Sequence, residues 1–411
     1  MKMSDAVLGE VIARAVDAEI GRSSYPEELP PLPPMPAARY ADAEFYALEQ
    51  EHLFKKMWLN VGHVSEVPNT GDYKLFEQLG LSVIVSRSAD GQVRAFRNVC
   101  RHRGAALLTE PQGNAKRFIC PYHAWGYDLE GNLRSVPEAH NFACLNKQKM
   151  PLLAVRCEIW RGFIFINQTD DASSLDDFLA PIEANVGSFP IEEFSVKGVI
   201  RAELECNWKS AFDNFIESYH IQTVHTKTIA PFIHPKSFTV FRLRGGHARM
   251  NAMKRGADTI FANSGQEAQI KTETLFSRYT LAFPRFPNGF FNLDPSGLSW
   301  MNFWPISQGR MLLEQYNLGR TMGSPVEDKA YWDTFDGMTR RILSEDVALF
   351  PGMRRAMESG ELTEVLLGVY EQAIYWYNEE IDRQIGIERI PERFRMQQVL
   401  GLSSESGAVW H

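Results

Sequence analysis

Apolar residues at helical spacing dominate the first part of the chain, apart from one proline-rich interruption. Residues 1–24 mix apolar and charged positions as an amphipathic helix does, and residues 42–58 return to the same periodicity. Between them, residues 25–37 contain six prolines, which excludes a helix or a central strand there. We therefore expect a helix, an extended surface arm and a second helix.

From about residue 59 to residue 168 the pattern changes to short stretches of β-branched and aromatic residues, separated by Gly, Asp and Asn. Two sequences, at 89–91 and 129–132, are typical of hairpin turns. This predicts an all-β domain. We place its boundaries at 41–168, and we expect residues 1–40 to pack, as helix and arm, on the domain that follows.

The remaining residues, 169–411, mix both patterns. Strand-like runs alternate with turns over 237–319, whereas helical spacing predicts helices over 208–220, 325–359 and 361–384. An antiparallel sheet covered by helices is an α+β arrangement. We expect this segment to form a second, larger domain.

Composition and charge narrow the classes of function. The chain has 411 residues and a formal charge of −8, from 51 acidic and 43 basic residues. This balance argues against a nucleic-acid partner, which usually meets a basic surface. No apolar run approaches the roughly 18–20 residues that span a bilayer, and the first residues lack the apolar core of a secretory signal. We expect a cytoplasmic protein without a membrane partner.

Four of the residues that can bind metals fall into two short motifs. Cys100 and His102 form C-x-H, and Cys120 and His123 form C-x-x-H, both beside predicted hairpins. Two thiolates and two imidazoles also suit a structural zinc ion, but zinc fingers usually continue into a helix, and here hairpin residues follow. This spacing is that of a Rieske [2Fe–2S] cluster, in which two histidines replace two cysteines on one iron. We therefore favour the cluster over zinc.

A second set of possible metal ligands is His220 and His225. Five positions on a helix separate two side chains by about 140°, so a helix containing His220 must end or kink for both rings to reach one metal. Two histidines and one carboxylate form the facial triad of non-haem Fe(II) oxygenases. Asp346 is the best candidate for the carboxylate. Glu345 is chemically able, but only one of the two neighbours can face the iron.

With these motifs, the chain resembles the catalytic (α) subunits of Rieske-type non-haem iron oxygenases, which include aromatic-ring-hydroxylating dioxygenases and related monooxygenases and demethylases. The likeness covers roughly residues 40–400 and rests on C-R-H-R-G, C-P-Y-H-A-W-G-Y, N-W-K, Y-H-x-x-x-x-H and S-E-D-x-x-L-F. It implies an all-β Rieske domain joined to a helix-grip (Bet v 1/START-like) catalytic domain with an antiparallel sheet. It also implies a mononuclear Fe(II) held by His220, His225 and Asp346.

The resemblance further implies a ring-shaped homotrimer (α3), with α3β3 as the alternative, in which each cluster serves the iron of a neighbouring subunit. Glu217 stands where the family places the carboxylate that bridges a cluster histidine of one subunit and an iron histidine of the next. The resemblance implies Asp there in many members and Glu in some members that oxidise quaternary amines. Asn214 matches a family position close to the iron. We read Trp208 as packing and Lys209 as a surface charge.

We expect a terminal oxygenase component. A separate reductase, directly or through a ferredoxin, would supply electrons from NAD(P)H, because no G-x-G-x-x-G lies between a predicted strand and a helix. O₂ would be activated at the iron to hydroxylate a small organic substrate. An aromatic ring is the first candidate, and oxidative N-demethylation or hydroxylation of a quaternary ammonium compound is the alternative.

The aromatic segment 281–304 can form a pocket wall, a cage for a quaternary ammonium group or plain sheet core. Arg285 is a candidate partner for a substrate carboxylate. Two other classes remain as remote alternatives. A Rieske electron carrier would not need His220, His225 or Asp346, and a hydrophobe-binding module would not need the cluster.

Overall fold

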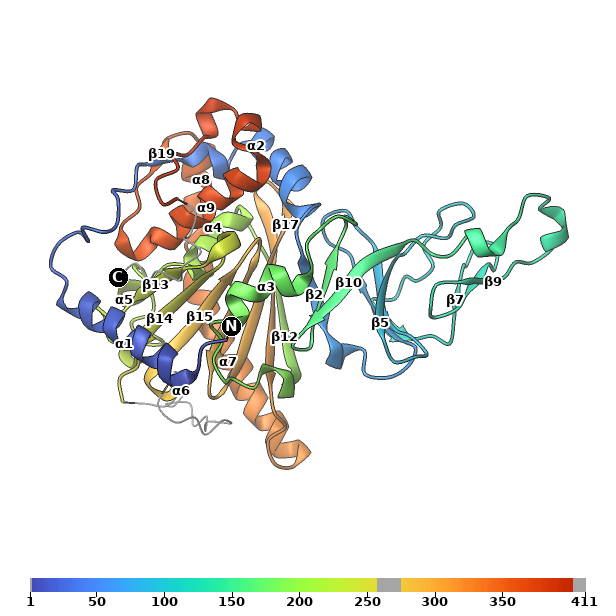
Figure 1. Cartoon of the computed structure of the whole chain (residues 1–411), viewed down its shortest axis with the longest axis horizontal. Helices are drawn as coiled ribbons and strands as arrows, with labels where there is room; N and C mark the ends of the chain where they lie inside the picture. The colour runs from blue at the N-terminus through green and yellow to red at the C-terminus, as the bar shows by residue number, and fades with distance from the viewer. Residues whose placement is uncertain (1, 257–274, 402–411) are drawn as a thin grey trace. The chain divides into compact units, whose positions relative to one another are not determined.

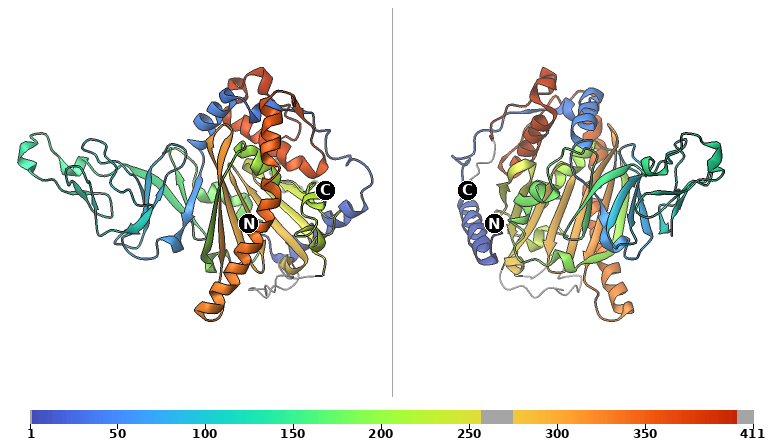
Figure 2. Two further views of the ribbon diagram at one scale, coloured as in Figure 1. Left: turned by 180° about the vertical axis from the view of Figure 1, so that it is seen from behind. Right: turned by 45° about the vertical axis from the view of Figure 1, so that its right-hand side comes forward.

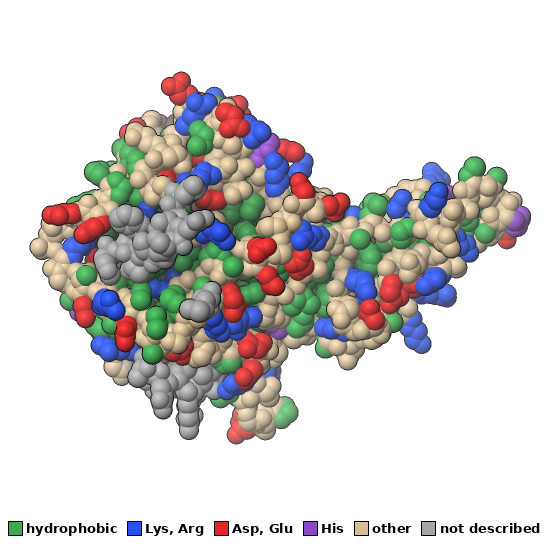
Figure 3. Space-filling view, in the orientation of Figure 1, with side chains coloured by type: hydrophobic (Ala, Val, Ile, Leu, Met, Phe, Trp, Pro, Cys, Tyr) green, Lys and Arg blue, Asp and Glu red, His purple; other side chains and the backbone are tan. Residues whose placement is uncertain are grey.

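The computed structural model describes residues 2–256 and 275–401 (Figure 1), which form two compact units. One unit is residues 55–175, and the other joins residues 1–54 to residues 176–411. No helix among the described residues is long and apolar enough to cross a bilayer. Acidic and basic side chains are interspersed over the face seen in Figure 3.

The unit 55–175 consists of antiparallel strands, as its short apolar stretches predicted. Seven strands form one sheet in the order β2-β11-β10-β5-β4-β3-β6, and three form another in the order β7-β8-β9. Both predicted turns are confirmed, since 89–91 joins β4 to β5 and 129–132 joins β8 to β9. The strands are β2 (Leu59–His63), β3 (Asp72–Phe76), β4 (Val83–Arg87), β5 (Val93–Arg97), β6 (Gln112–Asn114), β7 (Phe118–Ile119), β8 (Gly126–Tyr127), β9 (Leu133–Ser135), β10 (Ala154–Trp160) and β11 (Phe163–Asn167).

The other unit contains a second seven-stranded antiparallel sheet, in agreement with the expected α+β class. Its order is β12-β18-β17-β16-β15-β14-β13, so six strands follow one another along the chain and β12 lies beside the last of them. The strands are β12 (Ser195–Leu204), β13 (Thr239–Arg242), β14 (Ala248–Met253), β15 (Tyr279–Arg285), β16 (Gly289–Asp294), β17 (Gly297–Ser307) and β18 (Arg310–Gly319).

The helices belong almost entirely to this second unit. They are α1 (Asp5–Gly21), α2 (Ala43–Glu49), α3 (Leu175–Glu183), α4 (Trp208–Phe215), α5 (Ile221–Val224), α6 (Leu275–Arg278), α7 (Pro325–Val347), α8 (Phe350–Glu358) and α9 (Gln372–Ile385). The proline-rich arm ends in β1 (Met35–Pro36), which pairs with β19 (Glu364–Val365). The arm is therefore held by main-chain hydrogen bonds at its end.

The register of the sheet separates its side chains into two faces. Phe290 pairs with Met301, and Met301 pairs with Gln315, so these three side chains form a row on one face. Helix α4 packs on this face, where the ring of Phe215 lies 5.7 Å from that of Phe290. Figure 2 shows α7, in orange, running across the strands. His220, His225 and Asp346 gather between this face and the two helices.

Three predicted helices are shorter than their periodicity suggested. The helix expected over 208–220 ends at Phe215, and α5 begins only after His220. The helix expected over 325–359 breaks between Val347 and Phe350, because Pro351 has no N–H to donate to the carbonyl of Val347 and its ring would clash with that carbonyl. The helix expected over 361–384 begins only at Gln372, because residues 364 and 365 form β19 instead. Helix α8 ends before this segment, at Gly360, which has a φ of +73°.

Residues 43–54 lie in the unit that contains the large sheet, whereas the expected domain boundary at residue 41 placed them with the β domain. The reason is side-chain packing across the sequence. The ring of Phe45 lies 5.6 Å from that of Phe394, and Glu49 accepts a hydrogen bond from Lys209 over 2.6 Å. Periodicity predicted a helix here but contained no information about which domain it would contact.

Candidate metal centres

The two Cys–His motifs lie on matching loops of the β unit. Gly104 N–H donates to the carbonyl of Cys100 over 3.0 Å, and Ala124 N–H donates to the carbonyl of Cys120 over 3.0 Å. Gly104 and Ala124 occupy the same position in the two loops, with φ of +78° and +55°. This left-handed conformation turns each chain back sharply, which glycine does at Gly104 without strain.

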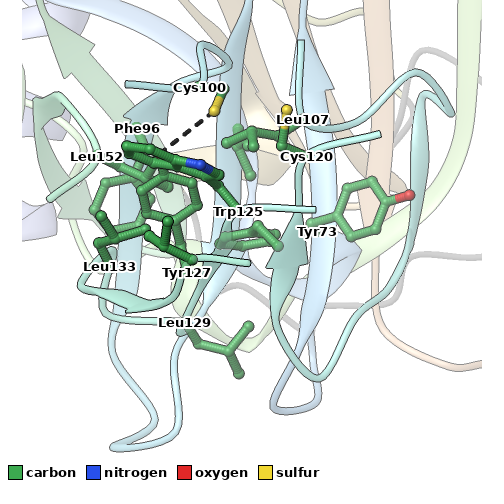
Figure 4. Close-up of a cluster of buried hydrophobic side chains, with 13 residues drawn as sticks. Tyr73, Phe96, Cys100, Leu107, Cys120, Trp125, Tyr127, Leu129, Leu133 and Leu152 are labelled. Atoms are coloured by element: carbon green, nitrogen blue, oxygen red, sulfur yellow. Dashed lines mark hydrogen bonds between the residues drawn. The ribbon is translucent and has the colours of Figure 1, made fainter. Parts of the chain in front are cut away.

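The four side chains of these loops fit a Rieske cluster. Cys100 and Cys120 are buried in the hydrophobic cluster of this unit (Figure 4), and burial raises the pKa of the Cys100 thiol. The Nδ1 atoms of His102 and His123 face each other over 3.2 Å, and Trp125 stacks on His102 at 4.8 Å. Two thiols therefore lie on the buried side and two imidazole nitrogens converge on the outer side, which is the donor set of a [2Fe–2S] centre with two histidines.

The second set of candidates also comes together. His220, His225 and Asp346 each offer one donor atom within 4.8 Å of the others. Asp346 Oδ1 lies 3.0 Å from His225 Nε2 and 3.7 Å from His220 Nε2. These three residues come from the segment after α4, from the end of α5 and from the last turn of α7. The break after Phe215 allows both rings to face one point.

The hydrogen bonds around these residues explain why a cation fits among them. His225 Nδ1 lies 2.8 Å from Glu345 Oε2, and His220 Nδ1 contacts Glu217 Oε1. A neutral imidazole that donates from Nδ1 to a carboxylate has a lone pair at Nε2. Both Nε2 atoms thus face Asp346 Oδ1, which is buried and accepts no hydrogen bond of good geometry. Three lone pairs directed at one point can hold a metal ion.

Glu217 lies in the loop between α4 and α5, rather than on a continuous helix with His220. Its Oε2 accepts from the backbone N–H of His220 over 3.3 Å and also contacts the N–H of Tyr219. The carboxylate of Glu217 therefore caps a turn while it contacts the ring of His220. One side chain holds both the ring and the backbone of His220.

Glu345 takes a part that the sequence did not predict. Its carboxylate could bind a metal, but the rotation of about 100° between neighbours on α7 turns it to the outer side of His225. There it also accepts from Thr228 Oγ1 over 2.5 Å. Burial alone would raise the pKa of Glu345, but the hydrogen bonds from His225 and Thr228 outweigh burial and lower it. Glu345 therefore remains a charged acceptor that orients His225.

A cavity of about 180 Å³ opens beside these residues, between the sheet face and α4, α5 and α7. Asn214 lines this cavity, as do Glu217 and the three candidate ligands. Most of the remaining lining is apolar: Phe215, Ile221, Ile229, Ile233, Phe238, Met250, Ala282, Phe290, Met301, Ile342 and Leu343. None of the described residues that line the cavity is Lys or Arg.

The aromatic segment 281–304 has two faces with different roles. Phe290 faces the cavity, whereas Phe283, Phe291 and Trp300 stack on the opposite face at centroid distances of 4.8 Å. Along these strands, one set of alternate residues forms the wall of the cavity and the other set forms the core of the sheet, so both of these interpretations of the segment hold. Arg285 belongs to the core face. It is fully buried, lies 5.0 Å from the ring of Trp300 and donates to Asn302, so it does not point into the cavity.

Lys209 is not a surface charge, contrary to expectation. Its side chain is fully buried and forms an ion pair of 2.6 Å with Glu49, which is also fully buried. Asp213, one turn further along α4, accepts from Tyr40 Oη over 2.5 Å. Burial raises the pKa of Asp213 to about 7. These polar contacts attach the residues before the β unit to the helix that leads to His220.

Comparison with known proteins identifies both regions. The family model for the Rieske [2Fe-2S] domain matches residues 57–149, and that for the ring hydroxylating alpha subunit (catalytic domain) matches residues 191–387. The carnitine monooxygenase oxygenase subunit of Escherichia coli (strain K12) is 39% identical over 194 residues, which is 46% of this chain and 52% of that protein. The benzene 1,2-dioxygenase subunit alpha of Pseudomonas putida is 37% identical over 190 residues, 45% of this chain and 42% of that protein.

The chain thus spans about half the length of the curated relatives it matches. Among solved structures, a quaternary ammonium Rieske monooxygenase superposes with a TM-score of 0.75 at 22% identity, covering 88% of this chain and 99% of that one. Naphthalene 1,2-dioxygenase from Rhodococcus sp., bound to indole, gives a TM-score of 0.73 at 19% identity, with 93% and 99% covered. At these identities the likeness establishes the fold.

Proposed function

From the membership of this chain in the family of Rieske non-haem iron oxygenase α subunits, we propose that it is the terminal oxygenase component of a multicomponent system. Its activity would be to hydroxylate a small organic substrate with O₂. The observation that carries this proposal is the convergence of His220, His225 and Asp346 at the wall of an apolar cavity. Bound to these sites, the cluster would supply single electrons and the iron would supply the centre at which O₂ is activated.

The protein side chains prepare this site in three ways. Glu217 and Glu345 hold the Nδ1 protons of His220 and His225, so that both Nε2 lone pairs point inward. The apolar lining holds the substrate beside the metal and excludes water. Asn214 faces the same cavity, where its amide can hydrogen-bond a water or a ligand.

The size and polarity of the cavity support an aromatic substrate. A cavity of about 150 Å³ with apolar walls is known to bind benzene, so the 180 Å³ found here suits a single ring. Since no Lys or Arg is present among the described lining residues, an anionic group would have no partner of opposite charge. We therefore favour hydroxylation of an uncharged aromatic ring.

A quaternary ammonium substrate is the second candidate, because of two observations. Phe215, Phe238 and Phe290 all line the cavity, and aromatic faces attract such cations. Glu217 replaces the Asp that many family members carry, and one of the similar proteins is a carnitine monooxygenase subunit. In this case the expected product is a demethylated or hydroxylated amine.

We propose that a separate reductase, directly or through a ferredoxin, takes electrons from NAD(P)H and delivers them to this chain. We further propose an α3 ring, with α3β3 as the alternative, in which Glu217 hydrogen-bonds a cluster histidine, His102 or His123, of a neighbouring copy. Light scattering of the purified complex measures this assembly directly.

A single-turnover experiment tests the function without the unknown reductase. The purified protein is reduced chemically, then mixed with ¹⁸O₂ and one compound at a time from a panel of one-ring aromatics and methylated amines. Mass spectrometry should find ¹⁸O in a hydroxylated ring, or formaldehyde with a demethylated amine. Asp346→Ala should abolish product and mononuclear iron while keeping the cluster spectrum.

The matched control is Asp333→Asn, which changes an exposed carboxylate on the same helix, and it should behave as the unaltered protein. Loss of the cluster spectrum in Asp346→Ala would contradict the assignment of the two sites. Product formation by that variant at an unchanged rate would contradict the role of the iron.

A further inference from the structure

Three of the described buried residues that line the cavity have an unpartnered polar atom without a role in holding the metal: Gln315, Thr339 and Asn251. Asn251 lies in one row with Leu281, Leu293 and Leu298 on the core face of the sheet, which leaves Gln315 and Thr339 as the two whose side chains concern the cavity. Gln315 of β18 is fully buried, and its Oε1 has no hydrogen-bond partner among the described residues. Thr339 of α7 is also buried, and its Oγ1 likewise lacks a partner. Both residues line the cavity. The large majority of buried polar side-chain atoms are hydrogen-bonded in proteins, so two unpartnered atoms in one cavity indicate where the polar group of a ligand binds.

A chain of hydrogen bonds determines which atom of Gln315 faces the cavity. Asp336 of α7 is an acceptor, so the amide nitrogen of Asn317 donates to it and the Asn317 oxygen remains free to accept. Gln315 Nε2 donates to that oxygen over 2.9 Å, which leaves Oε1 as the atom available to the cavity. Gly198 makes room for this arrangement, because a Cβ there would lie 2.7 Å from Asp336 Oδ2. The cavity therefore presents a fixed hydrogen-bond acceptor.

The sheet register places this acceptor beside an apolar surface. Gln315 is paired with Met301, and Met301 with Phe290, so the three side chains are neighbours in one row. A ring that lies against Met301 and Phe290 therefore has the Gln315 oxygen at its edge. The charged residues of the lining, Glu217 and Asp346, belong to the metal site.

We propose that Gln315 positions the substrate, and that the substrate is a one-ring molecule with an uncharged O–H or N–H group that donates to Gln315 Oε1. Thr339 Oγ1 can accept from or donate to the same group. This inference deepens the proposed oxygenase function and rests on it. It disfavours anionic rings, because a carboxylate at this position would face the Gln315 oxygen, and the described part of the lining contains no Lys or Arg to offset that repulsion.

Binding of three simple probes to the metal-loaded protein tests the inference by calorimetry. Benzyl alcohol carries a donor, methyl benzyl ether carries only an acceptor, and benzoate is an anion. One hydrogen bond should make benzyl alcohol bind about five- to tenfold more tightly than the ether. Benzoate should bind more weakly than both. Equal affinity for the alcohol and the ether, or tight binding of benzoate, would overturn the proposal.

Two variants show whether Gln315 causes this preference. Gln315→Met should remove the preference for the alcohol and leave ether binding intact, since the side chain stays long and flexible but loses its oxygen. Asp336→Asn acts from outside the cavity. An amide at 336 can donate as well as accept, so Asn317 and Gln315 can both rotate and present Nε2 to the cavity, and binding of the ether should improve relative to the alcohol.

Asp333→Asn removes the same charge from the exposed side of α7 and should leave the ratio of affinities unchanged. A preference for the alcohol that survives in both Gln315→Met and Asp336→Asn would refute the role of Gln315. The proposed function can fail separately. Preferential binding of the alcohol without ¹⁸O incorporation into any probe would refute the oxygenase proposal and leave the binding preference standing. Hydroxylation of all three probes alike would support the oxygenase proposal and refute the role of Gln315.

Discussion

Replacement of Glu345 should weaken iron binding even though Glu345 is not one of the three candidate ligands. His225 is 2% exposed, and its Nδ1 has Glu345 Oε2 as its partner at 2.8 Å. Without that acceptor, the ring can rotate or shift its proton to Nε2, the atom that faces Asp346. Either change removes a lone pair from the metal site.

The size of the effect follows from the hydrogen bonds that each variant keeps. Loss of a carboxylate that orients a metal-binding histidine typically lowers metal affinity about 10- to 100-fold, or about 1.4–2.7 kcal/mol. Glu345→Gln keeps an acceptor for His225 but loses its charge, so we expect iron affinity to fall by about tenfold, the smaller of these two values. Glu345→Ala leaves the buried Nδ1–H of His225 unpaired, so we expect iron affinity to fall by about 100-fold. Thr228→Val removes only the second donor to Glu345 and should have a smaller effect than either.

The measurement is the loss of mononuclear iron to a chelator of graded concentration, with the visible spectrum of the cluster as an internal reference. The cluster lies in the other unit of the chain and should remain fully occupied in all three variants. If Glu345→Ala holds iron as tightly as the unaltered protein, the orientation of His225 does not depend on Glu345, and the argument from its tautomer is wrong.

Three further predictions concern the network around α4 and the loop that follows. Lys209→Met should lower the free energy of unfolding by about 3–5 kcal/mol, because Glu49 stays buried without its partner; the added change Glu49→Gln should restore much of this in urea unfolding. In the folded protein the pKa of Asp213 is about 7, so between about pH 4 and pH 7 the folded state keeps a proton that the unfolded chain releases. The free energy of unfolding should therefore fall as the pH rises over this range, by at most about 1.4 kcal/mol per pH unit. Asp213→Asn should flatten that slope. Glu217→Gln keeps an acceptor for His220 and, in excess Fe(II), should still bind both metals, but it should slow reoxidation of the cluster in stopped-flow absorption. Undiminished turnover would contradict the bridging role.

Much of the architecture could be read from local patterns. Short apolar stretches with turn residues at 89–91 and 129–132 predicted the β unit, because side-chain alternation and turn chemistry act over a few residues. The Cys–His motifs were informative for the same reason, since each pair of ligands sits on one tight loop. The preference for Asp346 over Glu345 required only a resemblance and the rotation of a helix.

Other features depend on contacts between distant parts of the chain. Glu345 and His225 are 120 positions apart, and Lys209 and Glu49 are 160 apart, so neither partner could be identified from its neighbours in sequence. Periodicity also overestimated three helices, because the turn capped by Glu217, a proline and a strand pairing ended them. Tertiary contacts are stronger determinants of helix ends than the intrinsic propensity of the residues.

The sequence by itself determined the two-domain class, the two sets of candidate metal ligands and the family. The tertiary structure alone decided which residues surround the substrate and how they point. Alternate residues of β15, β16 and β17 face either the cavity or the core, and Gln315 presents its oxygen because Asn317 and Asp336, from two elements, hold its nitrogen. The physical reason is that the residues of a motif lie on one loop, so their spacing in the sequence reveals their role. A binding cavity, in contrast, is formed by side chains whose orientation depends on partners elsewhere in the fold.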